Sequence, residues 1–201
     1  MSAYELPTSI NVDGIEYKIT EGGDYRVILD CFAALGDVEL TVQERMISCL
    51  LIFYEQFNTI EDVITCANLE KLVLQMYAFF NCSKVHRKDK ETDSSSPNRH
   101  ILIDWEEDAQ LICSAINKVA GTEIRALEYL HWWTFMAYYM AVDHSLLNVI
   151  ASIRDKILRG KQLEKAERQF RAENPQYFNW NHKTVEEQEA EAWVHEIWNN
   201  E

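Results

Sequence analysis

Four carboxylates at the start of a predicted helix are the first residues whose types and spacing could do chemistry. They are Asp104, Glu106, Glu107 and Asp108, and the first and last share one helix face. Acid–base catalysis would need a second partner, and no recognisable motif places a histidine beside them. Carboxylates in a first helical turn are also favoured by capping and by the helix dipole. We therefore interpret the cluster as structural.

A fragment of a metal site is the second candidate. Cys82 and His86 are four residues apart, and His100 is the nearest other imidazole. A structural zinc site needs four ligands, usually as two paired groups, and no matching Cys/His pair follows here. The sequence therefore predicts neither a bound metal nor a cofactor.

The remaining reactive side chains form no catalytic pattern. The sequence lacks a Gly-rich phosphate loop, a strained nucleophile turn and an HExxH motif. Its 5 cysteines match no disulfide framework and lie near apolar or acidic residues, which does not favour a thiolate nucleophile. His131, next to Trp132, is typical of a core or interface histidine. We therefore expect a protein that is not an enzyme.

Composition and charge limit the classes of partner. The formal net charge of −14 repels nucleic acid and anionic lipid, although residues 151–183 are locally basic. The uncharged stretch Tyr129 to Val142 is too short to span a bilayer. The start of the chain has neither the basic nor the apolar part of a signal peptide, and unpaired cysteines suit a reducing compartment. These features predict a cytoplasmic protein that binds neither nucleic acid nor membranes.

The elements that must position these residues are mostly helices. The chain opens with a predicted β-hairpin over residues 1–20, in which two alternating strands flank Asp13-Gly14. Capping residues such as Asp24, Thr41, Thr59 and Ser145, together with apolar periodicity, then predict helices over about 24–35, 41–54, 59–80 (divided near Asn68), 104–119, 123–142 and 145–158.

The predicted fold class is mainly α, with the hairpin packed on a single helical domain over residues 21–180. Residues 83–100 are charged and serine-rich and predict a flexible loop within that domain. Residues 181–201 predict an acidic terminal helix.

Large aromatic side chains mark the predicted helix over 123–142 as a candidate partner-binding surface. Trp and Tyr are the residues that most often anchor protein interfaces, although the same side chains could simply fill the core. The candidate contact residues are Tyr129, Trp132, Trp133, Met136, Tyr139 and Met140. A basic run from Ile153 to Arg171 is either a solvated helix face or a contact for an acidic surface, including the chain's own residues 184–201.

The sequence resembles the phage "gene product fifteen" family of siphophages and prophages of Gram-positive bacteria. The order and spacing of the matching residues cover about 6–178, and the most specific match is Leu130-His131-Trp132-Trp133-Thr134-Phe135. Weaker matches are Leu6-Pro7-Thr8-Ser9, Asp13-Gly14, Asp24-Tyr25-Arg26-Val27, Asp104-Trp105-Glu106-Glu107-Asp108-Ala109, Leu111-Ile112-Cys113-Ser114-Ala115-Ile116 and Ile153-Arg154.

What the resemblance implies is a tail assembly chaperone-like protein of the host bacterial cytoplasm. Family members are usually encoded between the major tail protein and the tape measure protein. The implied partners are unassembled tape measure protein, the major tail protein and a companion tail chaperone, and an oligomer is compatible with this function. Two other classes stay open, namely a structural tail or virion component and a small regulatory helical binding protein. The family supplies no catalytic residues to carry over.

Overall fold

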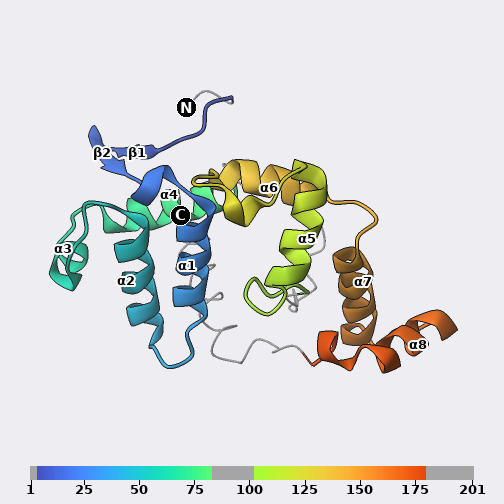
Figure 1. Cartoon of the computed structure of the whole chain (residues 1–201). Coiled ribbons are helices and arrows are strands. Elements are labelled where there is room, and N and C mark those ends of the chain that lie inside the picture. The colour runs from blue at the N-terminus through green and yellow to red at the C-terminus, as the bar shows by residue number, and fades with distance from the viewer. Residues whose placement is uncertain (1–3, 83–101, 180–201) are drawn as a thin grey trace, which may run out of the picture. The chain divides into compact units, whose positions relative to one another are not determined.

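The computed structural model describes residues 4–82 and 102–179 and is mainly helical (Figure 1). This confirms the predicted fold class of helices with an N-terminal hairpin. The strands are β1 (Ser9–Val12) and β2 (Ile15–Lys18), and the helices are α1 (Tyr25–Gly36), α2 (Val42–Phe53), α3 (Ile60–Ile64), α4 (Leu69–Phe80), α5 (Ala109–Ala120), α6 (Trp132–Met140), α7 (Leu146–Leu158) and α8 (Lys165–Glu173). Single 3-10 turns occupy Thr20–Gly22, Ile124–Ala126 and Pro175–Tyr177.

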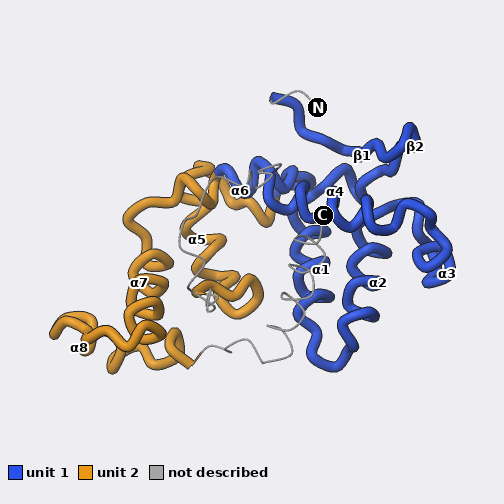
Figure 2. The backbone as a smooth tube through the Cα atoms, turned by 180° about the vertical axis from the view of Figure 1, so that it is seen from behind, with its two compact units in different colours: residues 1–89, 127–137 blue, residues 90–126, 138–201 orange. Residues whose placement is uncertain are grey.

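The chain divides into two units (Figure 2). Unit 1 contains residues 1–89 and 127–137, and unit 2 contains residues 90–126 and 138–201. The chain therefore leaves unit 1, begins unit 2, returns to unit 1 for eleven residues and leaves it again within α6. The predicted helical domain over 21–180 spans both units. The predicted loop at 83–100 and the predicted helix at 181–201 lie outside the described residues.

The hairpin forms as its turn residues predict. Asp13 and Gly14 both have positive φ, 52° and 83°, as a type I′ turn requires, and the Asn11 side chain accepts a hydrogen bond from the Gly14 N–H. β1 and β2 pair antiparallel, with Ile10 opposite Tyr17. β1, with the buried Ile10 and Val12, contacts α4, and the buried Tyr17 ring packs against Tyr54 and Phe57 after α2.

Helices α1, α2 and α3 of unit 1 begin where capping residues predict. The Asp24 carboxylate accepts the Arg26 N–H at the start of α1, and Thr41 and Thr59 form capping boxes that open α2 and α3. Asn68 separates α3 from α4, as predicted. The core between these elements consists of fully buried side chains that include Ile28, Cys31, Cys49, Leu50, Phe53, Leu72 and Met76.

Unit 2 is built around a buried ion pair that sequence reasoning missed. Arg154 on α7 and Asp108 at the start of α5 are exposed by only 1% and 2%. The Arg154 guanidinium donates to both oxygens of the Asp108 carboxylate, with an Nη2–Oδ1 distance of 3.0 Å. It also donates to the backbone carbonyls of Leu102 and Tyr177. One side chain thus joins the first and last described segments of unit 2.

The predicted helix over 104–119 is correspondingly shorter than expected. α5 begins at Ala109, and the residues before it form hydrogen-bonded turns. The Asp104 carboxylate accepts the N–H groups of Glu106 and Glu107, and the Asp108 carboxylate accepts the Asp104 N–H. Asp104 and Asp108 therefore have structural partners, in agreement with the structural interpretation of the cluster.

One apolar cluster of unit 2 joins α7 to the segment that follows it and to Leu111 of α5. Ser145 caps α7 as predicted, and Gly160 follows its end with a φ of 63°. Lys156 forms an ion pair with Glu167 of α8 at 2.6 Å. The buried residues of this cluster are Ile150, Ile153 and Phe178, and Leu111, Ile157, Leu158, Leu163, Phe170 and Tyr177 pack against them.

Substitution of one member of the buried pair is expected to destabilise unit 2 strongly. Asp108→Ala leaves a buried guanidinium without its carboxylate, so the free energy of unfolding should fall by about 3–5 kcal/mol. Asp155→Ala is the matched control, because its partner Arg159 is 62% exposed and exposed pairs contribute little. Chemical denaturation of the three proteins measures the difference, and equal losses for the two variants would contradict a central role for Arg154–Asp108.

Candidate partner-binding surface

The helix that carries the predicted surface starts later than the sequence indicates. The predicted helix over 123–142 was wrong in its first half, because Ile124–Ala126 is a 3-10 turn and α6 begins only at Trp132. The backbone on either side of His131 pairs with the backbone around Asp24 as an antiparallel bridge. The Tyr25 N–H donates to the Leu130 carbonyl at 2.9 Å, and the Trp132 N–H donates to the Gly23 carbonyl at 2.8 Å. Tertiary pairing overrides the helical pattern here.

Asp24 holds this crossing together. Its carboxylate is buried and accepts both the Arg26 N–H that begins α1 and, at 2.8 Å, the Leu130 N–H of the returning chain. The Arg26 guanidinium pairs with the same carboxylate at 3.1 Å and donates to the Leu127 carbonyl at 2.6 Å. A residue predicted only as a helix cap therefore also fixes a segment 106 positions away.

His131 is a buried structural histidine, as the sequence suggested. Its Nε2 lies 3.1 Å from the Pro7 carbonyl, and its Nδ1 accepts the Trp133 N–H at 3.0 Å. This arrangement fits the neutral ring with its proton on Nε2. Gly23, with a φ of +81°, allows the close approach, because a Cβ atom there would lie 2.8 Å from Phe79 Cζ.

The two neighbouring tryptophans cap the end of α4. The indole N–H of Trp132 donates to the Phe80 carbonyl and that of Trp133 to the Phe79 carbonyl, each at 2.9 Å. The last carbonyls of a helix have no partner within the helix, so these two indoles supply donors that α4 cannot supply itself. Trp132 also stacks on Phe135 at 5.4 Å. The paired tryptophans thus have a structural function in unit 1.

The six predicted contact residues differ widely in exposure. Trp132 is 1% exposed, which leaves it no area for a partner. Trp133, Met136 and Tyr139 are half-buried, and Tyr139 packs against Trp105 at 5.3 Å. Tyr129 and Met140 are 48% and 55% exposed. The partner-binding role of this set stays a prediction, and only part of its aromatic area reaches the surface.

Two exposed apolar pairs were missed by sequence reasoning. Ile60 and Ile64 on α3 are 59% and 60% exposed, and Leu146 and Val149 on α7 are 44% and 47% exposed. Their spacings of four and three residues place each pair on one helix face. Such spacing predicts a helix, but it does not show which apolar side chains of that helix are exposed to solvent.

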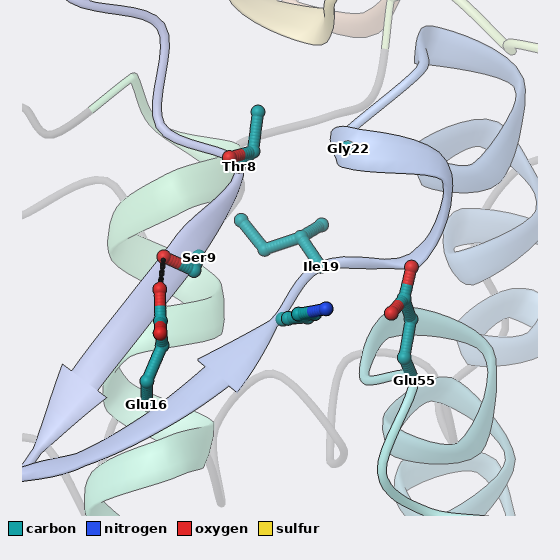
Figure 3. A pocket seen from close by; sticks show the side chains of 7 residues that line it. Thr8, Ser9, Glu16, Ile19, Gly22 and Glu55 are labelled. Carbon is teal, nitrogen blue, oxygen red and sulfur yellow. Dashed lines mark hydrogen bonds between the residues drawn. The ribbon is translucent and has the colours of Figure 1, made fainter.

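A shallow pocket lies on the polar face of the hairpin in unit 1 (Figure 3). Its volume is about 270 Å³, and it is lined by Thr8, Ser9, Glu16, Lys18, Ile19, Gly22 and Glu55. Ser9 Oγ donates to the Glu16 carboxylate at 2.6 Å, so part of its polar lining is already paired.

No metal centre and no membrane span occur in the part of the chain that the structure describes. There, no three His, Cys, Asp or Glu side chains gather as a metal site would require. Of the zinc fragment, Cys82 is described, whereas His86 and His100 lie outside the described residues. No helix in the same part is both long enough and apolar enough to cross a bilayer.

Loss of an indole N–H is expected to destabilise unit 1 most where the carbonyl that it bonds has no other donor. Trp132→Phe removes the donor of the Phe80 carbonyl in a buried position, which should lower the free energy of unfolding by roughly 1–3 kcal/mol. Trp133→Phe should have a smaller effect, because the Phe79 carbonyl keeps the Cys82 N–H at 2.9 Å. Urea denaturation compares the two variants, and a larger loss for Trp133→Phe would contradict this assignment.

The stability of unit 1 is expected to fall on mild acidification. Burial lowers the pKa of His131 below its ordinary 6.5, against smaller opposing effects of the Pro7 carbonyl and Asp24. The unfolded chain then binds a proton more readily than the folded one, so this stability is complete above pH 6.5 and is lost as the pH falls through the lowered pKa. Denaturation at several pH values should give a flatter profile for His131→Gln; parallel profiles would refute the prediction.

Comparison with known proteins places the chain in one family. Residues 3–177 match the family model described as bacteriophage Gp15 protein, which agrees with the resemblance seen in the sequence. No curated protein and no solved structure gives a significant match. Because the family model covers most of the 201 residues, the chain belongs to the bacteriophage Gp15 protein family.

Proposed function

We propose that this protein is a tail assembly chaperone-like protein that binds unassembled tape measure protein, tail tube subunits or both in the host cytoplasm. The proposal assigns it no catalytic step and no cofactor. The observation that carries it is the presentation of apolar side chains on α3, in carboxylate-rich surroundings, by a member of a phage protein family.

α3 holds its apolar pair in a fixed orientation. Val63 is fully buried and anchors the helix, whereas Ile60 and Ile64 are 59% and 60% exposed. The Asp62 carboxylate accepts the N–H groups of Thr59 and Asn58 at 2.8 and 3.0 Å, and these bonds, led by that of Asn58, hold the pKa of Asp62 below its usual value. A short helix with such a cap is already ordered before a partner binds, so binding loses little backbone entropy.

α7 presents a second apolar pair in unit 2. Leu147 and Ile150 are buried, whereas Leu146 and Val149 on the neighbouring positions are about half exposed. Full burial of such a side chain contributes roughly 1.5–3 kcal/mol, so completing the burial of each contributes about half of that. Contacts of this size suit a chaperone, which must release its client when the tail assembles.

The charge of the chain supports the same proposal. A net charge of −14 keeps a complex soluble while the apolar side chains of a client are covered. The tape measure protein, as the family resemblance describes it, is a long and largely apolar helical chain that needs such cover. Helix-on-helix contact between apolar stripes is a common mode for recognition of this kind.

Co-expression with the tape measure protein of the same phage tests the proposed function. We expect the tape measure protein to become more soluble and to co-purify with this protein. We also expect purified virions to lack this protein, because a chaperone leaves the finished tail. An unchanged solubility without co-purification would refute the proposal, and detection of the protein in virions by mass spectrometry would favour a structural tail component.

Charge placed on the exposed pair should reduce client binding without unfolding unit 1. The double variant Ile60→Asp/Ile64→Asp is expected to lower co-purification by about tenfold, as loss of roughly 1.4 kcal/mol would. The matched control is Ala67→Asp/Gln75→Asp, which adds the same charge at two other exposed positions of unit 1. Equal losses for both double variants would show that net charge, and not the α3 pair, governs binding.

A further inference from the structure

The two outer edges of the β1–β2 hairpin differ in their hydrogen bonds to the rest of unit 1. The edge of β2 is covered by the Gln56 side chain, which accepts the Lys18 N–H at 3.1 Å and donates to the Glu16 carbonyl at 3.4 Å. The Glu55 N–H also donates to the Lys18 carbonyl at 3.1 Å. The backbone after α2 therefore takes the place of a third strand beside β2.

The register shows which backbone groups of β1 point away from β2. In an antiparallel pair, alternate residues exchange their hydrogen bonds with the partner and the residues between them point outward. The backbone groups of Glu16 and Lys18 bond to Gln56, away from β1. The backbone groups of their partners on β1, Asn11 and Ser9, are therefore directed away from β2. Within residues 4–82 and 102–179, no hydrogen bond reaches the backbone N–H or carbonyl of Ser9 or Asn11.

β1 has little protection as an open edge. Its length of four residues is one of the ways in which natural sheets limit an edge, but its sequence, Ser9-Ile10-Asn11-Val12, contains neither a charge nor a proline. Among the residues that the structure describes, a segment that covers an edge by hydrogen bonds is found at β2 and not at β1. In the close-up, Glu55 lies on the β2 side of the hairpin, and Ser9 lies on β1 with its hydroxyl bonded to Glu16 (Figure 3).

We propose that β1 accepts an extended segment of the client protein as a third strand, by hydrogen bonds to the backbone of Ser9 and Asn11. That this client is tape measure protein or a tail tube subunit rests on the proposed function. The backbone bonds would supply affinity, and alternate side chains of the added strand would supply specificity. On the polar face they would lie beside Ser9 and Asn11 and within reach of the Glu16 carboxylate, which favours lysine or arginine there.

The charge of unit 1 favours this occupant over a second copy of the chain. Residues 4–82 contain 13 acidic and 4 basic side chains, so two copies repel one another. A pairing of two four-residue strands also buries far less than the roughly 1,200 Å² of a stable interface. A client that contacts α3 or other exposed apolar side chains as well can add the missing area.

Backbone amide exchange followed by NMR on the whole protein tests the added strand directly. The Ser9 and Asn11 amides should exchange rapidly in the free protein and become protected when tape measure protein binds. The Lys18 amide, already bonded to Gln56, is the internal control and should change little. Protection of Ser9 and Asn11 that appears without a client and grows with protein concentration would identify a second copy as the occupant and overturn the proposal.

The variant pair Ser9→Pro and Ser9→Ala separates the backbone from the side chain. Ser9→Pro removes the outward N–H, which the β1–β2 ladder does not use, and should weaken client binding about tenfold. Ser9→Ala keeps the N–H and loses only the hydroxyl bond to Glu16, so it should bind the client more tightly than Ser9→Pro does, and equal losses for the two variants would count against the backbone bond.

The outcomes distinguish this inference from the proposed function. A complex that forms equally with Ser9→Pro and leaves both amides unprotected would overturn the added strand and leave the chaperone proposal standing. Failure of the intact client to bind would count against the chaperone proposal. Tiled 15-residue peptides of the tape measure and tail tube proteins then decide the inference: a peptide that protects the two amides supports it, and protection by none overturns it.

Discussion

The Asp24 carboxylate is the constraint on which unit 1 depends. It begins α1 by accepting the Arg26 N–H, and it receives the chain that returns from unit 2 by accepting the Leu130 N–H. The start of α6 follows from this crossing, because the helix can begin only where the bridge between Asp24 and His131 ends. The passage of Gly23 beside Phe79 leaves no room for a Cβ atom, so the crossing requires glycine there.

The most specific sequence motif of the chain is thereby explained by structure. Leu130 supplies backbone bonds to the start of α1, His131 joins the returning chain to Pro7, and the indoles of Trp132 and Trp133 complete the end of α4. The sequence indicated that this aromatic segment is an interface, but its first residues mainly hold segments of unit 1 together. Other exposed apolar side chains lie on α3 of unit 1 and on α7 of unit 2.

Local chemistry was predictable from the sequence, and distant pairing was not. Asp13-Gly14 determines a hairpin turn and Thr41, Thr59 and Ser145 determine helix starts, because the atoms involved lie within a few residues. Arg154 and Asp108 are separated by 46 positions, and each looks like an ordinary surface charge in its own segment. The start of α6 was predicted wrongly for the same reason. Exposure of the α3 pair likewise depends on what Val63 packs against, which periodicity does not reveal.

We propose that the protein binds its client through exposed apolar side chains, whereas the aromatic motif holds unit 1 together. Oxidative footprinting of the protein, alone and with tape measure protein, separates these two roles when it is read out by mass spectrometry. Labelling of Ile60 and Ile64 should fall when the client binds, and labelling of Trp132 should be low in both states. Protection confined to Trp133, Met136 and Tyr139, with the α3 pair unchanged, would refute this division of roles.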